Sequence, residues 1–328
     1  MTLPPSFAAT PFNQIAPALF WGMAGVLVLL VLGTAAALLL PVLQPARDHT
    51  NLRQRMLSWW VMAALVGAAL LLGWPATLGL FALISFMALR EFLSLAPLRR
   101  EDRLVVLLAY LVIPANYGLL AIDRYGIYLV FIPVWTFMFG PFILAMIGQT
   151  RAYLSTAAIF NWGLITCVYN IGFAAYLART PLTQAPQAGG AGLVFFLLLA
   201  TEANDVAQYV WGKLTGRHKI TPKVSPNKTW EGFLGGWATT ALLIWFVGPW
   251  FLPLRGWPLA VLAASMPVAG FAGDVTMSAV KRDLGVKDTS QTIPGHGGVL
   301  DRIDSLTFTA PLYFHLIIFF CFSKLPWP

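Results

Sequence analysis

The chain has little charge and almost no cysteine. Only 10% of its 328 residues are charged and 58% are hydrophobic, against about 25% and about 45–50% in an ordinary soluble domain. The shortage of charge excludes a soluble globular protein, because one aqueous core could not bury this much apolar surface. Cys167 and Cys321 lie far apart in separate apolar runs, which gives no sign of a disulfide framework. The bilayer must therefore be part of the solvent of this chain.

What the chain has instead is a series of long apolar runs. Crossing a hydrocarbon core of roughly 30 Å takes about 20 apolar residues. Ten runs qualify: 18–43, 57–74, 76–93, 104–122, 126–148, 155–178, 191–212, 232–253, 257–279 and 306–323. We therefore expect an all-α, polytopic integral membrane protein of about ten transmembrane helices. Residues 1–17 hold no basic region and no small-residue cleavage site, so we expect the first run to be a retained helix.

The 21 lysines and arginines are divided unequally between alternate loops. Seventeen fall in one set of loops: Arg47, Arg53, Arg55, Arg90, Arg99, Arg100, Arg103, Arg151, Lys213, Arg217, Lys219, Lys223, Lys228, Lys281, Arg282, Lys287 and Arg302. The other set holds Arg124, Arg179, Arg255 and Lys324. Because cytoplasmic loops collect Lys and Arg, the first set is predicted to be cytoplasmic and both termini external, in the cytoplasmic membrane. The net charge of +8 thus reports topology, and no nucleic-acid partner is needed to explain it.

We divide the chain into two regions. Residues 1–190 are predicted to form N-terminal transmembrane helices, and 191–328 a C-terminal transmembrane catalytic region. The second region holds two unusual polar segments, 213–231 and 280–305, which combine basic residues with Gly, Pro, Ser, Asp and His. Since both fall in the basic set of loops, the polar site is expected to face the cytoplasm.

Two acids stand within the run 191–212. Glu202 and Asp205 are three residues apart, so they share one face of a helix. A charge at that depth costs about 2.5–3.5 kcal/mol and usually faces a bundle interior, a cavity or a partner. A buried polar network would explain one acid alone. Two acids beside Asn204 favour a hydrated site.

The segment 213–231 carries a candidate phosphate grip. It ends in the run Ser225-Pro-Asn-Lys228-Thr-Trp-Glu-Gly232, where Ser225 and Lys228 offer hydroxyl and ammonium donors suited to phosphate oxygens. Topology alone would make this loop basic. It does not explain a run of this composition leading straight into a membrane helix.

The segment 280–305 carries candidate metal ligands. Asp301 and Asp304 are spaced so that a helix presents their oxygens on one face, as Mg²⁺ prefers. Asp274 approaches the same membrane surface and offers a third ligand. The run Pro294–Gly298 gives backbone freedom and exposed N–H groups near a helix N-terminus, which suits an anion. Carboxylates for a metal and amides for a phosphate are expected to converge here.

A long gapped pattern resembles the defining motif of the phosphatidate cytidylyltransferases, or CDP-diacylglycerol synthases: Ser278-x-x-Lys281-Arg282-x-x-x-x-Lys287-Asp288-x-x-x-x-x-Pro294-Gly-His296-Gly-Gly-x-x-Asp301-Arg302-x-Asp304. Two further blocks of that family resemble Asn204-Asp205 and Ser225-Pro-x-Lys228-Thr-x-Glu231-Gly232. The resemblance covers about residues 200–305, with Arg90-Glu91 a faint echo outside it. The chain has Met277 where the family usually has an acid, and its ten spans exceed the family's nine.

The resemblance implies transfer of the cytidylyl group from CTP to phosphatidic acid in the bilayer, giving CDP-diacylglycerol and pyrophosphate in phospholipid biosynthesis. Mg²⁺ would be held by Asp274, Asp301 and Asp304, with Asp205 a ligand or a neighbour, and a second cation stays open. The phosphates would be held by Ser225, Lys228, Lys281, Arg282, Lys287 and Arg302. His296 would orient a phosphate or the leaving pyrophosphate. A homodimer also stays open.

Three alternatives remain at this point. A polytopic ion or solute transporter would use Glu202, Asp205 and Asp274 to coordinate a permeating ion. A nearer alternative is a CTP-dependent enzyme that acts on another lipid phosphate, or a lipid kinase that uses CTP. Met277 also leaves an inactive relative open.

Overall fold

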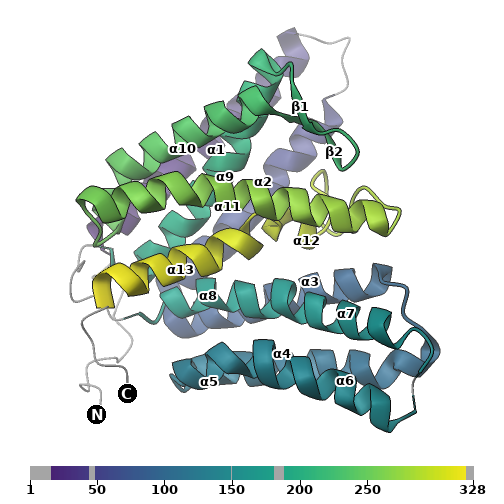
Figure 1. Cartoon of the computed structure of the whole chain (residues 1–328). Coiled ribbons are helices and arrows are strands. Elements are labelled where there is room, and N and C mark those ends of the chain that lie inside the picture. Colours follow the sequence, from purple (N-terminus) through teal and green to yellow (C-terminus); the bar gives the residue numbers. More distant parts are fainter. Residues whose placement is uncertain (1–15, 44–48, 149, 181–187, 323–328) are drawn as a thin grey trace.

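The computed structural model describes residues 16–43, 49–148, 150–180 and 188–322 (Figure 1). The predictions for the N-terminal residues 1–15 and for the charges of Arg47 and Lys324 lie outside these ranges. Within them, ten helical stretches are long and apolar enough to cross a membrane. The prediction of an all-α, polytopic integral membrane protein is therefore confirmed.

The first six stretches occupy the N-terminal half of the chain. They comprise α1 (Pro17–Leu43), α2 (Thr50–Leu72), α3 (Trp74–Leu95), the short helix η2 (Arg100–Asp102) with α4 (Arg103–Ala121), α5 (Tyr125–Val130) with η3 (Phe131–Thr136) and α6 (Phe137–Met146), and α7 (Tyr153–Leu164) with η4 (Ile165–Tyr169) and α8 (Asn170–Leu177). The elements η3 and η4 are π-helical turns within the fifth and sixth spans. Insertions of this kind are common as single-turn bulges inside longer helices.

The remaining four stretches carry the predicted site. They comprise α9 (Gly189–Thr215), α10 (Trp230–Phe251), α11 (Gly256–Asp283), and α12 (Leu300–Ile303) with α13 (Leu306–Phe322). Between α9 and α10 the chain forms an antiparallel hairpin of β1 (Lys219–Thr221) and β2 (Ser225–Thr229). The Ser225–Thr229 run, which we expected as a loop, is thus a strand.

The helices are packed in layers. In Figure 1, α9, α10, α11 and α13 lie above α3, α7 and α8, and α4, α5 and α6 lie below. The longest contact runs along α9 and α10. Glycines permit this closeness, since a Cβ at Gly236 would overlap the Gln208 side chain and a Cβ at Gly232 would lie 2.9 Å from the Gln208 carbonyl oxygen. Asp205 is consequently held on a helix that is fixed against its neighbour.

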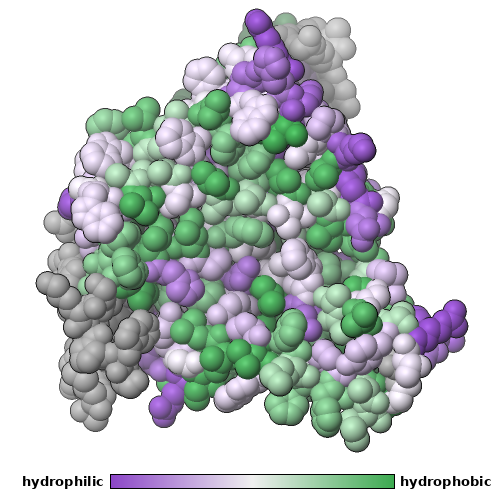
Figure 2. Space-filling model, viewed as in Figure 1, coloured by the Kyte–Doolittle hydropathy of each residue, from purple (hydrophilic) through white to green (hydrophobic). Residues whose placement is uncertain are grey.

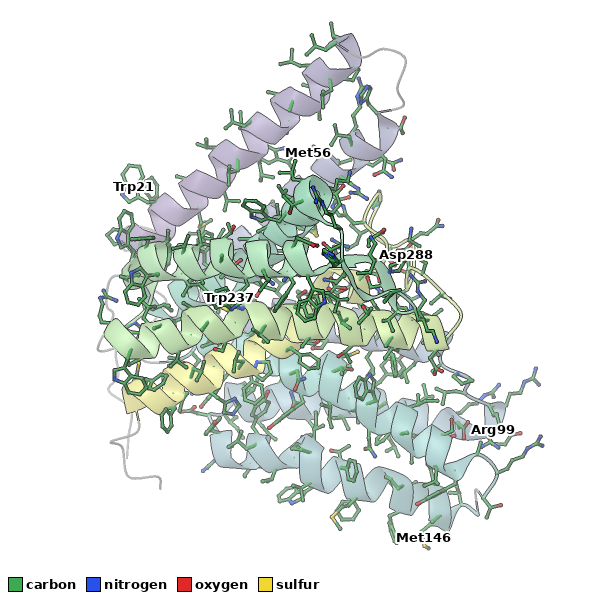
Figure 3. All side chains as sticks on the ribbon, turned by 45° about the horizontal axis from the view of Figure 1, so that its top comes forward. Trp21, Met56, Arg99, Met146, Trp237 and Asp288 are labelled. Atoms are coloured by element: carbon green, nitrogen blue, oxygen red, sulfur yellow. The ribbon has the colours of Figure 1, made fainter. Side chains whose placement is uncertain are left out.

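The helices α1 and α2 diverge from the rest of the bundle toward the end that carries the β-hairpin (Figures 1 and 3). Leu29, Leu32 and Val42 of α1 are exposed. Figure 2 shows hydrophobic side chains over most of the visible face and hydrophilic ones gathered at its upper and right edges. Exposed apolar surface on this scale is what a lipid-facing surface requires.

The hairpin and the segment 284–304 lie at the same end of the helices (Figure 1). Both belong to the basic set of loops. The positively charged connections therefore cluster at one end of the molecule, as the alternation of charge in the sequence requires.

Candidate active site

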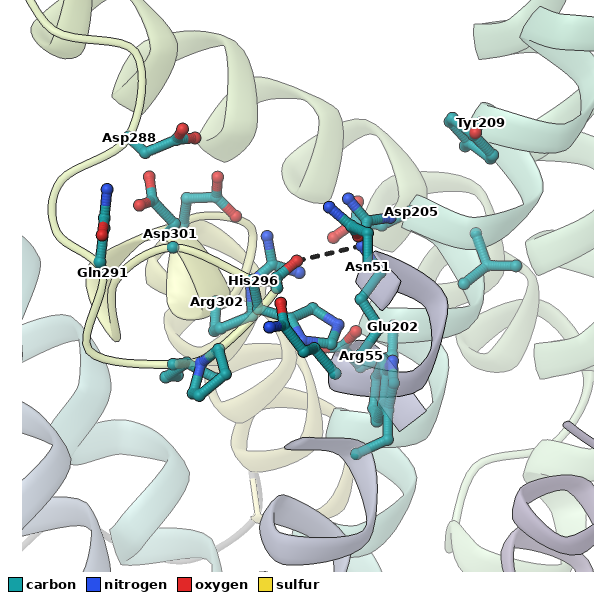
Figure 4. A pocket seen from close by; sticks show the side chains of 18 of the residues that line it. Asn51, Arg55, Glu202, Asp205, Tyr209, Asp288, Gln291, His296, Asp301 and Arg302 are labelled. Atoms are coloured by element: carbon teal, nitrogen blue, oxygen red, sulfur yellow. Dashed lines mark hydrogen bonds between the residues drawn. The ribbon is translucent and has the colours of Figure 1, made fainter. Parts of the chain in front are cut away.

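A cavity of about 1070 Å³ opens between α2, α9, α11 and the segment 287–304. Figure 4 shows the side chains of Arg55, Glu202, Asp205, His296 and Arg302 converging on it. Its charged lining residues are Arg55, Glu202, Asp205, Asp274, Lys287, Asp288, Asp301, Arg302 and Asp304. The cavity thus brings together carboxylates and cationic side chains from four separate parts of the chain.

One carboxylate cluster lies where α9, α11 and α12 meet. Asp205 accepts a hydrogen bond of 3.0 Å from the Ser305 hydroxyl, and the amide of the same serine donates to Asp304 Oδ1 at 2.8 Å. Asp274 accepts a hydrogen bond of 3.2 Å from Ser278. The sequence predicted Asp274, Asp301 and Asp304 as metal ligands with Asp205 as a ligand or a neighbour, and all four residues line the cavity.

Two lysines neutralise part of this charge. Lys228 Nζ lies 2.6 Å from Asp274 Oδ2. Lys281 Nζ lies 2.8 Å from Asp301 Oδ1 and 3.9 Å from Asp304 Oδ2. Neither lysine lines the cavity in this structure, so each acts there through the carboxylate it binds.

Asp301 organises the segment before it. Its Oδ1 binds Lys281, while its Oδ2 accepts hydrogen bonds from the Thr289 amide at 2.8 Å and the Gly298 amide at 3.0 Å, and lies 2.9 Å from the Thr289 hydroxyl. Both carboxylate oxygens are therefore engaged by protein donors. In this arrangement Asp301 holds the segment 289–298 in place.

The exposed amides expected after Pro294 are mostly occupied. The Gly298 amide donates to Asp301, and the Val299 and Leu300 amides donate to the two oxygens of Glu91, at 3.0 and 2.9 Å. The expectation that the run Pro294–Gly298 leaves its amides for a phosphate is therefore wrong at Gly298, and also at His296, whose amide donates to the Ile293 carbonyl. Carboxylates of the protein itself satisfy the amides of Gly298, Val299 and Leu300.

In the described part of the chain, side-chain nitrogens of His296 and Arg302 remain without partners, and Arg302 Nε is a donor for an anion. Among the described residues, His296 Nδ1 and Arg302 Nε are buried with no hydrogen-bond partner, and both residues line the cavity. Burial, with Arg302 and Arg55 nearby, lowers the pKa of His296 to about 4. His296 is consequently neutral near pH 7 and would orient a phosphate by hydrogen bonding rather than by charge.

Only one of the three remaining predicted phosphate ligands lies at the cavity. Lys287 lines the cavity, whereas Ser225 and Arg282 do not. Ser225 pairs with Thr221 in the hairpin. Arg282 donates to the carbonyls of Val224 and Val286, at 3.3 and 3.0 Å, and so links the hairpin to the segment after α11.

Sequence reasoning missed the contribution of α2. Asn51, Gln54, Arg55 and Trp59 line the cavity. Arg55 Nε donates to the Gly295 carbonyl at 3.0 Å (Figure 4), and Ser58 Oγ donates to the Pro294 carbonyl at 2.7 Å. The sequence signal for this contribution was the polar segment just before the second apolar run. The helix α2 begins at Thr50 and not at residue 57, so it includes that polar segment.

Met277 does not remove a group from the cavity. Its side chain is 1% exposed, belongs to the hydrophobic core and does not line the cavity. An acid at this position would therefore point into apolar surroundings of this particular chain.

The carboxylates at the cavity are of the right chemical type for Mg²⁺, but their positions do not form a metal site. Carboxylate oxygens are the ligands that Mg²⁺ prefers, and Asp205, Asp274 and Asp304 provide them. Across the described residues, however, no three His, Cys, Asp or Glu side chains are grouped closely enough to hold a metal ion. Lys228 and Lys281 bind the carboxylates instead.

The fold and the cavity define a multi-pass integral membrane protein with a site suited to phosphate-bearing substrates. A family model described as the cytidylyltransferase family matches residues 53–320. The chain belongs to this family, whose members are nucleotidyltransferases. The sequence resemblance to phosphatidate cytidylyltransferases is thereby confirmed at the level of the family.

Several relatives extend the comparison. The chain is 39% identical over 302 residues to "Uncharacterized protein YnbB" of Escherichia coli (strain K12), covering 92% of this chain and 98% of that one. It is 38% identical over 136 residues to the phosphatidate cytidylyltransferase of Staphylococcus haemolyticus (strain JCSC1435), covering 41% and 52%. It is 42% identical over 119 residues to that of Mycobacterium leprae (strain TN), covering 36% and 38%. The chain thus spans about half or less of these two phosphatidate cytidylyltransferases.

Proposed function

We propose that the protein transfers the cytidylyl group of CTP to phosphatidic acid. The observation that carries this proposal is the mixed lining of the cavity. Arg55, Lys287 and Arg302 line it together with Val206 and Tyr209, two α9 side chains that are 55% and 60% exposed on a membrane-spanning helix. A site that combines cationic groups with exposed side chains of a membrane-spanning helix suits a phosphate carried by acyl chains.

The chemistry requires charge neutralisation more than a strong base. The phosphate oxygen of the lipid is already an anionic nucleophile, so the main barrier is the approach of two polyanions. Arg302, Lys287 and Arg55 would lower that barrier by binding phosphate oxygens, and His296 would orient one by hydrogen bonding. Lys228 and Lys281 would hold the carboxylates of Asp274, Asp301 and Asp304 in position.

Mg²⁺ stays part of the proposal. Asp274 and Asp304 would hold it with Asp205 or Asp301 once these carboxylates are drawn closer together than the described structure has them. Asp301 is the weaker choice because both its oxygens bind protein donors. When bound, the ion would neutralise phosphate charge and align the reacting groups. The proposal leaves a second cation and a homodimer open.

The site is proposed to face the cytoplasm, where CTP arrives. The support is the clustering of the basic connections at the end of the helices that holds the cavity (Figure 1). The lipid headgroup lies at the same membrane surface.

An acceptor panel tests this function. The full chain in lipid nanodiscs receives CTP and Mg²⁺ with phosphatidic acid, another lipid phosphate, or diacylglycerol, and pyrophosphate release is followed with the lipid product. We expect product with phosphatidic acid, and a large loss of kcat/KM in Arg302→Gln. The matched control is Arg124→Gln, an exposed arginine on the opposite set of loops. Turnover with another acceptor only, or equal loss in both variants, would overturn the proposal.

A further inference from the structure

Glu91 is an acid that the site chemistry does not use. It lies on α3, in the part of the chain that the motif does not reach, and it is only 7% exposed. It does not line the cavity. A buried carboxylate is costly unless it is paired or hydrogen-bonded, so its partners indicate its role.

Those partners all belong to one segment. Glu91 Oε1 accepts hydrogen bonds from the Val299 amide at 3.0 Å and the Ser290 hydroxyl at 2.7 Å. Its Oε2 accepts one from the Leu300 amide at 2.9 Å and lies 3.2 Å from the Thr289 hydroxyl. One carboxylate therefore joins both ends of the segment 289–300, about 200 residues later in the chain.

The segment between these anchors forms one wall of the cavity. Ser290, Gln291 and the run Ile293–Gly297 line it, and Asp301 and Arg302 follow directly. The packing against the anchor is close, because a Cβ at Gly298 would overlap Glu91 Oε2 and the Thr289 hydroxyl. A displacement of Glu91 would thus move Arg302 and His296 together.

We infer that Glu91 is a positioning residue, which fixes the wall that carries His296, Asp301 and Arg302 from outside the cavity. The inference rests on the proposed function for its effect on turnover. Since Glu91 touches no substrate space, it acts through the hydrogen bonds that close the segment into a loop. The N-terminal helices thereby contribute to the site of the C-terminal region.

Three variants of the full chain in nanodiscs test this. Glu91→Gln replaces one carboxylate oxygen with an NH₂ group, which would face hydrogen-bond donors of the segment 289–300. Glu91→Asp keeps the carboxylate, but on a side chain that is one methylene shorter. The control is Asp102→Asn, which removes a fully buried carboxylate that binds Arg99 in the connection between α3 and α4. Each variant is measured for thermal stability, for kcat and KM per folded molecule, and for amide hydrogen exchange in peptides covering 289–300.

We expect Glu91→Gln to speed exchange in 289–300 and to lower kcat by about 100-fold, the usual scale for a misplacement of about 1 Å, with little change in KM for CTP. Glu91→Asp should recover part of kcat, and Asp102→Asn should lose stability while keeping kcat. Unchanged exchange, unchanged kcat, or an equal loss of kcat in Asp102→Asn would overturn the inference. If the wild-type chain transfers no cytidylyl group, the proposed function fails, and the exchange data alone then decide whether Glu91 anchors the segment.

Discussion

Replacing Lys281 with methionine is the sharpest test of how the carboxylate cluster is held. The Lys281 side chain is 12% exposed, and its ammonium lies 2.8 Å from Asp301 and 3.9 Å from Asp304, whose side chains are 4% and 14% exposed. Removing one partner of a buried pair leaves an uncompensated charge and costs about 3–5 kcal/mol. Oδ2 of Asp301 keeps its three contacts with Thr289 and Gly298, which still stabilise the charge. The expected loss in the free energy of unfolding is therefore at the lower end of that range, about 3 kcal/mol.

A double-mutant cycle isolates this pair. The free energy of unfolding is measured in mixed micelles for Lys281→Met, for Asp301→Asn and for the two together. Since the groups are in contact, the double variant should lose less than the sum of the singles, with a coupling of about 1–3 kcal/mol. Lys219→Met, an exposed lysine in the hairpin, is the control and should change stability by less than about 0.5 kcal/mol. Additive losses would refute the argument that Lys281 neutralises Asp301.

Four further predictions follow from the site. Asp274→Asn should sharply lower turnover at limiting Mg²⁺ with little loss of folded protein, and near-normal activity would remove Asp274 from the proposed metal site. Gly298→Ala should lower both stability and turnover because the new Cβ overlaps Thr289 and Glu91; wild-type Tm and kcat would contradict this. Because the pKa of His296 is lowered from 6.5 to about 4, the unfolded chain binds this proton more readily, so stability should fall as pH decreases from 6.5 to 4. His296→Gln should flatten that fall in pH-dependent unfolding. A cysteine introduced as Lys219→Cys should resist an impermeant thiol reagent added to intact cells, and external labelling would reverse the topology.

The helices and most of the carboxylates could be predicted because each depends on local sequence. Long apolar runs define spans by length alone, and their number agrees with the described structure. Asp205 and Asp274 stand in the second half of such runs and Asp304 just before one, and helices packed side by side bring these positions together. Lys287, His296 and Arg302 were found through a gapped motif, and they line the cavity.

The remaining site depends on contacts that no local pattern reveals. Arg55 and Glu91 reach the segment 289–300 across about 200 residues or more, and only the packing of α2 and α3 places them there. The amides near Gly298 looked available because the sequence does not show which acid will occupy them. Ser225 is part of strand β2, and Arg282 of α11 binds the Val224 carbonyl of the hairpin. The sequence does not show these contacts because the hairpin forms only when β1 and β2 pair.

The fate of the CTP phosphates tests the central claim most directly. The full chain in nanodiscs with phosphatidic acid and Mg²⁺ receives CTP labelled at either the α- or the γ-phosphate. Cytidylyl transfer predicts that the α-label enters the lipid while the γ-label leaves in pyrophosphate, in equal amounts. A γ-labelled lipid would identify a kinase, and no labelled lipid from either form would contradict the account.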